Sequence, residues 1–305
     1  MGHIMTVLGP IAPETLGPTL MHEHLFIDLA GRKQDPDTRL DDVDTACQEV
    51  ALLQELGGRG LVEVTCLGMG RQADAMRQVA ARTGLQVIAS TGFYQKSYHP
   101  PYVSERSAEE LADRLVREVE EGLDGTAVRP GILAEIGTSR DEIHPDEAKV
   151  FRAVALTHRR TGLAISTHCT LGTMAEQQLD LLEGEGVDPG RIVLGHQDLR
   201  DDLELHVRLA RRGAAIAYDT AGKEKYMPDA VRVRLITGML EKGLGDRVVL
   251  SMDITRRSHL SRHGGYGYGH LLRTLVPALR AAGVGERDLT AMLVDNPRRI
   301  LTIPD

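Results

Sequence analysis

Short runs of apolar residues alternate with longer amphipathic stretches along almost the whole chain. The runs are typical of buried strands, and the stretches, with apolar residues three or four positions apart, are typical of helices. We predict strands at residues 19–28, 60–66, 86–92, 131–137, 163–168, 191–195, 214–219 and 247–253. We predict the helices that follow them at 41–56, 71–82, 105–121, 145–160, 173–185, 203–211, 229–242 and 271–281.

Continuously apolar strands separated by helices indicate a parallel sheet whose faces are both covered. Eight such units predict an α/β fold, a closed (β/α)8 TIM barrel. The alternative is an open doubly wound sheet, but its glycine-rich phosphate turn after the first strand is missing. The glycine-rich run 264–269 stands before the last helix and is interpreted as a mobile loop at the barrel mouth. A further amphipathic helix at 286–301 is predicted to cap the bottom or side of the barrel.

The length of 305 residues suits one barrel, so we predict a single domain over residues 6–305. Residues 1–5 are interpreted as a remnant of cloning ahead of a natural start at Met5. Charged residues make up 26% and apolar residues 42% of the chain, as in globular proteins. No apolar run approaches the roughly 20 residues that span a bilayer, so we expect a soluble protein with no membrane partner.

The formal charge of -8, with no basic block, argues against a nucleic-acid partner. Cys47, Cys66 and Cys169 are far apart and odd in number, without a secretory signal ahead of them. We therefore expect reduced cysteines and a cytoplasmic location.

Polar side chains stand on or directly after five of the predicted strands. They are His22, His24, Glu135, His168, His196 and Asp253. In such barrels the carboxyl ends of the strands converge on the active site. A single one of these residues would more often be a satisfied core group, whereas six together favour a metal site. Nitrogen and oxygen ligands suit zinc, manganese, cobalt or iron.

His22 and His24 stand two residues apart in the first predicted strand. Because side chains on a strand alternate between faces, both imidazoles project to the same side, with Glu23 pointing the other way. The pair can therefore chelate one ion.

Six sequence segments resemble the phosphotriesterase family of the amidohydrolase superfamily, and within it the phosphotriesterase homology protein branch. The likeness runs from about Thr6 onward. The segments are MHEHLF (21–26), AEIGTS (134–139), STH (166–168), GHQD (195–198), SMDITRRSHL (251–260) and GGYGYGHLL (264–272).

The resemblance implies a (β/α)8 barrel with a binuclear metal centre, and it suggests a homodimer. It implies that His22, His24 and Asp253 hold the more buried metal, and that His168 and His196 hold the more exposed one. The cofactors are then two divalent ions, with Zn²⁺ favoured and Mn²⁺, Co²⁺ or Fe²⁺ as alternatives.

In most of the family a carboxylated lysine at the end of the fourth strand bridges the two metals. Residues 128–139 contain no lysine, so Glu135 is the candidate bridge. Lys96, after the third strand, is the substitute if Glu135 is not the bridge.

The predicted function is a metal-dependent hydrolase. A metal-bridging hydroxide would attack the carbonyl of a small uncharged ester, lactone or amide, and Asp253 would accept the proton. One alternative is a phosphotriesterase, and another is a catalytically idle metal-binding scaffold.

Candidate substrate-binding residues lie in loops that follow strands. Tyr94 follows the third strand, and Arg256 and Tyr266 follow the eighth. Packing is an equal alternative for Tyr94, and pairing with a surface acid is one for Arg256. Cys169 is predicted to pack behind the barrel. The other histidines are predicted to lie at the surface: His3, His99, His144, His158, His206, His259, His263 and His270.

Overall fold

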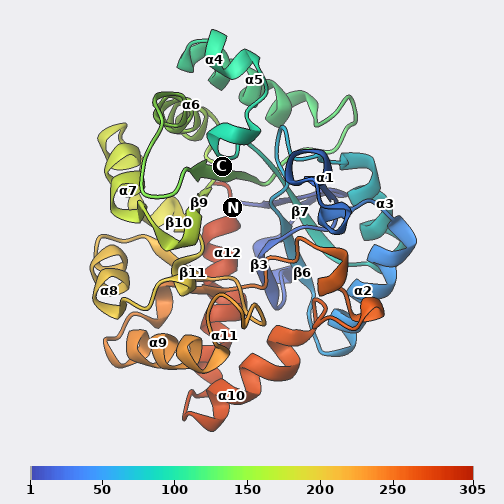
Figure 1. Cartoon of the computed structure of the whole chain (residues 1–305), viewed down its shortest axis with the longest axis vertical. Helices are drawn as coiled ribbons and strands as arrows, with labels where there is room; N and C mark the ends of the chain where they lie inside the picture. The colour runs from blue at the N-terminus through green and yellow to red at the C-terminus, as the bar shows by residue number, and fades with distance from the viewer. Residues whose placement is uncertain (1, 305) are drawn as a thin grey trace.

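A computed structural model, which describes residues 2–304, confirms the predicted barrel. Eight parallel strands follow one another in the order β12-β11-β10-β9-β8-β7-β6-β3, and helices surround them (Figure 1). The strands are β3 (Thr19–Glu23), β6 (Gly60–Glu63), β7 (Gln86–Thr91), β8 (Ile132–Thr138), β9 (Ile165–Cys169), β10 (Ile192–Leu194), β11 (Ala215–Tyr218) and β12 (Val248–Leu250).

One helix of the outer ring follows each strand, close to the predicted bounds. These helices are α2 (Val43–Glu55), α3 (Ala73–Thr83), α5 (Ala108–Glu121), α6 (Pro145–Thr161), α7 (Ala175–Gly184), α8 (Leu203–Arg211), α9 (Asp229–Glu241) and α10 (Val276–Ala281). A π-helical turn at Leu271–Leu275 leads into α10. Within residues 2–304 no helix is long and apolar enough to cross a membrane.

Several short elements lie around this ring, and apart from residues 27–28, which belong to the predicted strand 19–28, the sequence pattern did not predict them. They are the hairpin β1 (Ile4–Thr6) and β2 (Gly9–Ile11), the pair β4 (Ile27–Asp28) and β5 (Arg39–Leu40), and helices α1 (Ala30–Lys33) and α4 (Tyr102–Glu105).

Local sequence signals set the helix ends. Ser107 caps α5, because its hydroxyl accepts from the Glu110 amide while the Glu110 side chain accepts from the Ser107 amide. Gly84 ends α3 with φ +74°, a left-handed conformation that glycine adopts without a Cβ penalty.

The apolar core has two layers, because alternate strand residues face opposite sides of the sheet. Val62 and Ile88 belong to a cluster inside the barrel, while Leu61 belongs to the layer between strands and helices. Ile300 of α12 (Asn296–Leu301) joins the inner cluster. The predicted helix at 286–301 forms as α11 (Glu286–Thr290), a π-helical turn (Ala291–Asp295) and α12, and it caps the barrel interior.

Two predicted strands end earlier than their apolar runs, because buried carboxylates take over the backbone hydrogen bonds. The amides of Leu25 and Phe26 donate to Glu63, so β3 ends before them. The amides of Met252 and Ile254 donate to Glu23, so β12 ends sooner than predicted. Both chain segments turn at the carboxyl end of the barrel.

The glycine-rich segment 264–269 was predicted to be a mobile loop, but it packs against the barrel. Tyr268 is buried and its hydroxyl donates to the His24 carbonyl oxygen at 2.6 Å. The Gly267 amide donates to the His259 carbonyl. A buried aromatic anchor therefore holds this loop in place.

Two histidines predicted at the surface are buried. His99 is 8% exposed, and its Nε2 lies 2.7 Å from the Tyr94 carbonyl oxygen. His206 on α8 is fully buried against the sheet, with Nδ1 2.9 Å from the Tyr218 hydroxyl. Sequence reasoning failed here because each histidine finds a single polar partner inside an otherwise apolar contact.

Burial lowers the pKa of His206 to about 4, below the ordinary value of 6.5. The folded chain therefore binds this proton less readily than the unfolded chain. The contribution of neutral His206 to the free energy of unfolding is present above pH 6.5 and is lost as the pH falls toward 4. We expect His206→Asn to be less acid-sensitive than the wild type, by up to about 3 kcal/mol over that range. Urea unfolding of both proteins at several pH values measures the difference, and parallel pH curves would contradict it.

Candidate metal centre

The six predicted ligands meet at the carboxyl end of the barrel. His22 lies on β3, His24 directly after it, Glu135 on β8 and His168 on β9. His196 follows β10 and Asp253 follows β12. All six residues are at most 9% exposed. Three clusters have ligand atoms within 4.8 Å of one another: His22 with His24 and Glu135, His22 with His196 and Asp219, and Glu135 with His168 and His196.

Glu135 stands at the middle of the cluster. Its Oε1 lies 2.5 Å from His168 Nδ1, 3.2 Å from His196 Nε2 and 3.3 Å from His22 Nε2. Its Oε2 lies 3.8 Å from His24 Nε2. The carboxylate therefore faces histidines from both predicted ligand groups, as a bridging group requires.

Asp253 closes the site opposite Glu135. Its Oδ1 lies 3.3 Å from His24 Nε2, and its other oxygen forms an ion pair with the Lys223 ammonium. Asp253 and His196 both adopt left-handed backbone conformations, with φ of +51° and +57°. Such conformations are uncommon outside glycine and cluster at functional sites.

The buried polar atoms of His22 test whether this site suits metal ions. Neither Nδ1 nor Nε2 of His22 forms a hydrogen bond of good geometry, although the side chain is 1% exposed and carboxylate oxygens of Glu135 and Asp219 lie 3.3 Å away. A buried imidazole without such bonds costs free energy, which coordination of an ion would recover. The donor set of imidazole nitrogens and carboxylate oxygens fits divalent transition metals.

Buried charges of opposite sign face one another in the site. Burial acts to raise the pKa of Glu135, but the surrounding His168 and His22 hold it well below its ordinary value. Burial likewise acts to raise the pKa of Asp253, and Lys223 together with the histidines holds it well below normal. Burial acts to lower the pKa of His196, but the Asp219 carboxylate raises it well above normal. Metal binding therefore competes with protons on the same groups.

Two polar residues near the site were missed in the sequence. Asp219 follows β11 and accepts from the His196 amide, and its Oδ1 lies 2.9 Å from His196 Nδ1. Its Oδ2 lies 3.3 Å from His22 Nδ1. Lys223 stands in the same loop between β11 and α9, facing Asp253. Asp219 ends an apolar strand exactly as the predicted ligands do, so the same signal could have found it; Lys223 carried none.

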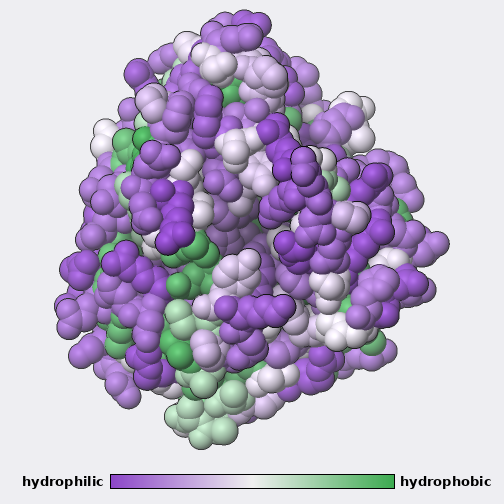
Figure 2. All heavy atoms as spheres, viewed as in Figure 1, coloured by the Kyte–Doolittle hydropathy of each residue, from purple (hydrophilic) through white to green (hydrophobic). Residues whose placement is uncertain are grey.

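The cavity above the ligands has a volume of about 200 Å³. Tyr94, Arg256, His259, Lys33 and Lys223 are among the residues that line it. Figure 2 shows a hollow near the middle of this face, bordered mainly by hydrophilic side chains with a hydrophobic strip on one side. The basic side chains make the cavity suitable for an anionic ligand.

The three predicted substrate residues occupy different positions. The Tyr94 hydroxyl lies 3.1 Å from His168 Nε2, inside the cavity. Gly137 allows the Tyr94 segment to approach β8, since an added Cβ would stand 2.7 Å from the Gln95 amide nitrogen. Arg256 lines the cavity but pairs with Asp35 at 2.5 Å. Tyr266 is not among the cavity-lining residues, and its ring stacks on His259 instead.

Two other candidate residues, Cys169 and Lys96, lie outside the predicted metal site. Cys169 packs behind the barrel as predicted, with its Sγ 3.1 Å from Gln178 Oε1, and burial raises its pKa to about 12. A thiol with that pKa is a poor nucleophile at neutral pH. Lys96 forms an ion pair with Asp146 and does not line the cavity.

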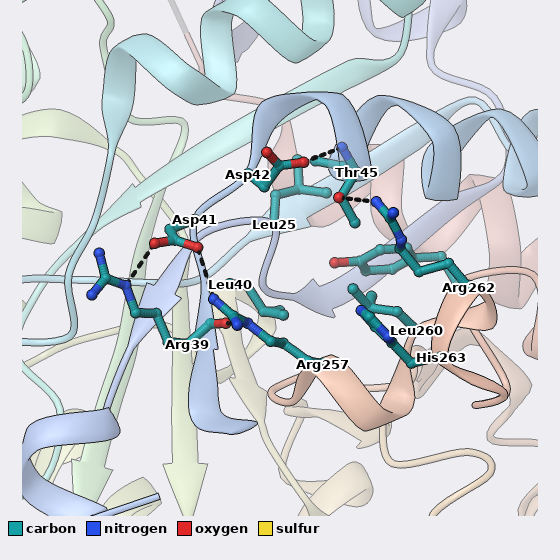
Figure 3. Close-up of a pocket in the computed structure, with 12 residues that line it drawn as sticks. Leu25, Arg39, Leu40, Asp41, Asp42, Thr45, Arg257, Leu260, Arg262 and His263 are labelled. Carbon is teal, nitrogen blue, oxygen red and sulfur yellow. Dashed lines mark hydrogen bonds and ion pairs between the residues drawn. The ribbon is translucent and has the colours of Figure 1, made fainter. Parts of the chain in front are cut away.

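A second cavity, of about 420 Å³, lies between the start of α2 and the segment after β12 (Figure 3). Its charged rim is largely paired with itself. Arg39 and Arg257 both contact Asp41, and Asp42 accepts from the Thr45 amide. None of the six predicted ligands lines it, whereas five of them line the smaller cavity.

Comparisons with known proteins agree with this site. Residues 2–301 match the model of the phosphotriesterase family. The chain is 48% identical to the phosphotriesterase homology protein of Escherichia coli, over 92% of this chain and 96% of that protein. It is 31% identical to an N-acetyltaurine hydrolase of Tetraodon nigroviridis, over 99% and 98% of the two chains.

Solved structures show the same fold. The E. coli phosphotriesterase homology protein, complexed with phosphate in its active site, superposes with a TM-score of 0.93 at 46% identity, covering 95% of this chain and 100% of that one. A lactonase from Listeria monocytogenes gives a TM-score of 0.95 at 29% identity, covering 99% and 100%. The chain therefore belongs to the phosphotriesterase family, and it is a metal-dependent hydrolase built on a (β/α)8 barrel.

Proposed function

We propose that this protein uses two zinc ions to hydrolyse an ester, lactone or amide bond in a small substrate that carries an anionic group. The observation that carries the proposal is the convergence of four buried histidines and two carboxylates beneath one cavity. The nitrogens of His22, which are buried and form no hydrogen bond, support metal coordination there.

The ligands divide into two sets around Glu135. The buried ion would be held by His22, His24 and Asp253, and the exposed ion by His168 and His196. Support comes from the distances between Glu135 and members of both sets, 3.3 Å to His22 and 2.5 Å to His168. When bound, two such ions supply an activated water and polarise the carbonyl oxygen of the substrate.

Residues of the chain itself then transfer the proton and orient the substrate. Asp253, kept ionised by Lys223, accepts the proton released on attack and returns it to the leaving group. The Tyr94 hydroxyl, 3.1 Å from His168 Nε2, is placed to orient a substrate oxygen in the cavity.

Three cationic side chains support an anionic substrate in place of the uncharged one expected from the sequence. Lys33, Lys223 and Arg256 all line the cavity. Asp35 and Asp37 pair with Arg256, and Asp253 pairs with Lys223, which leaves Lys33 as the cation without a carboxylate partner in the part of the chain that the structure describes. N-acetyltaurine, after which one relative is named, is an amide that bears a sulfonate. A phosphotriester carries no such charge, so the phosphotriesterase alternative is less well supported.

The test is a set of matched substrates given to zinc-loaded protein. N-acetyltaurine is compared with neutral N-ethylacetamide, and a carboxylate-bearing lactone with γ-butyrolactone, beside p-nitrophenyl acetate and a dialkyl p-nitrophenyl phosphate. We expect turnover of carbonyl substrates, with a higher kcat/KM for the anionic member of each pair. Fastest turnover of the phosphotriester would overturn the proposed bond class.

Lys33→Gln is expected to raise KM for the anionic substrate about fivefold while leaving kcat nearly unchanged. The reason is that a partly exposed charge pair contributes about 1 kcal/mol to binding, which corresponds to a factor of about five. Steady-state kinetics measure it. Lys225→Gln, an exposed lysine outside the cavity, is the matched control. An equal KM in both variants would remove Lys33 from substrate binding.

We also propose a cytoplasmic location and a homodimer. Three free cysteines support a reducing compartment, and family resemblance supports the dimer. Light scattering on the purified protein tests the oligomeric state.

A further inference from the structure

A chain of buried polar side chains leads away from His24, on the side opposite the cavity. The Thr65 hydroxyl lies 2.7 Å from His24 Nδ1 and 2.8 Å from Glu63 Oε1. Thr65 and Glu63 are fully buried, and neither lines the cavity. These side chains therefore cannot touch substrate, and any influence on the reaction passes through His24.

The hydrogen-bond donors around Glu63 fix the direction of this chain. The amides of Leu25 and Phe26 donate to Oε1, at 3.2 and 3.3 Å, and the Thr65 amide donates to Oε2 at 3.1 Å. Burial raises the pKa of Glu63 to about 8, whereas the hydrogen bonds from Thr65, Phe26 and Leu25 favour its charged form. The ionised carboxylate acts as an acceptor on both oxygens, and the Thr65 hydroxyl donates its only proton to it. The hydroxyl oxygen must then accept from His24, which places the ring proton on Nδ1.

His24 Nε2 is consequently left with its lone pair. That atom faces the centre of the site, 3.3 Å from Asp253 Oδ1 and 3.8 Å from Glu135 Oε2. Only the unprotonated nitrogen of a neutral imidazole can coordinate a metal. The ring orientation and the tautomer that coordination needs are thus set before an ion arrives.

We propose that Thr65 and Glu63 are positioning residues that fix the Nδ1–H tautomer of His24 and so hold its Nε2 ready for the buried metal ion. The inference rests on the proposed binuclear site. The other histidines are oriented differently: His196 Nδ1 contacts the Asp219 carboxylate, and His168 Nδ1 contacts Glu135. Within the described chain, His24 is the ligand whose outer nitrogen meets a threonine hydroxyl that is itself held by a carboxylate.

Thr65→Val removes the hydroxyl and keeps the shape of the side chain. We expect zinc affinity for one of the two ions to fall 10- to 100-fold, the usual effect of losing such an outer contact, while the second ion stays bound. Chelator competition followed by elemental analysis measures both affinities without relying on activity. Thr65→Ser should restore near-wild-type affinity, and Thr157→Val, a buried threonine on α6 that bonds only its own helix, should leave it unchanged.

Nuclear magnetic resonance of zinc-loaded protein labelled with ¹⁵N-histidine supplies a readout that a merely structural defect would not reproduce. We expect a slowly exchanging Nδ1–H signal from His24 in the wild type and in Thr65→Ser, and rapid exchange of that proton in Thr65→Val. Wild-type protein with two zinc ions but with the His24 proton on Nε2, or equal zinc affinity in Thr65→Val and the wild type, would overturn the inference. Failure of the wild type to bind zinc would overturn the proposed function instead.

Discussion

Glu135→Gln is expected to lose the exposed metal ion and, with it, nearly all turnover. Glutamine keeps the shape of the side chain but removes the negative charge that offsets the repulsion between two divalent ions. The exposed ion should leave first, because it would retain only His168 and His196, whereas the buried ion would retain His22, His24 and Asp253. The metal content measured by elemental analysis should fall from close to two ions per chain toward one.

The control is Glu49→Gln, another buried carboxylate, which accepts from the amides of Ser261 and Arg262 outside the metal site. It should keep both ions. If Glu135→Gln binds two ions and turns over normally, Glu135 is not the bridge. Lys96 is then an unsuitable carboxylated substitute, because it pairs with Asp146 away from the cavity, and Lys223 becomes the lysine to examine by mass spectrometry.

Asp253→Asn is expected to keep most of the bound metal and to cut kcat by about 10²- to 10⁴-fold, the typical loss when a general acid or base is removed. The amide oxygen can still act as a weak ligand, but the side chain can no longer accept a proton. Metal content and kcat should be measured on the same preparation, so that loss of rate is separated from loss of metal. Near-wild-type kcat would remove Asp253 from the proton path.

A related prediction concerns Lys223 and the pH dependence of kcat. Its ammonium pairs with Asp253 and helps to hold the carboxylate ionised. Lys223→Met should therefore move the acid limb of the kcat profile toward higher pH, because the pKa of Asp253 is no longer lowered by that charge. The metal content should stay at the wild-type level. An unchanged pH profile would indicate that the metal ions alone keep Asp253 ionised.

The sequence predicted the barrel well because its signals are local. A strand buried on both faces needs an unbroken apolar run, and an outer helix needs an apolar stripe, so the eight units could be counted along the chain. Gly84 and the Ser107 cap marked helix ends without any help from distant residues. The ligand set could be predicted for a related reason. Parallel strands all end on one side of the barrel, so His168 at the end of one strand and Asp253 after another meet wherever their strands lie.

The tertiary structure decided what depends on neighbours across the barrel. Glu63 ends β3 early and Glu23 ends β12 early, because each carboxylate accepts from backbone amides of a different segment. No pattern within either segment indicates that partner. The burial of His206 and the approach of Lys223 to Asp253 depend in the same way on which side chain stands opposite. The sequence by itself therefore determined the fold and the convergence of the six predicted ligands at one end of the barrel, since period and strand order fix these. Tertiary packing alone determined their hydrogen-bond partners, charges and tautomers, since these depend on contacts between residues that are remote in the chain.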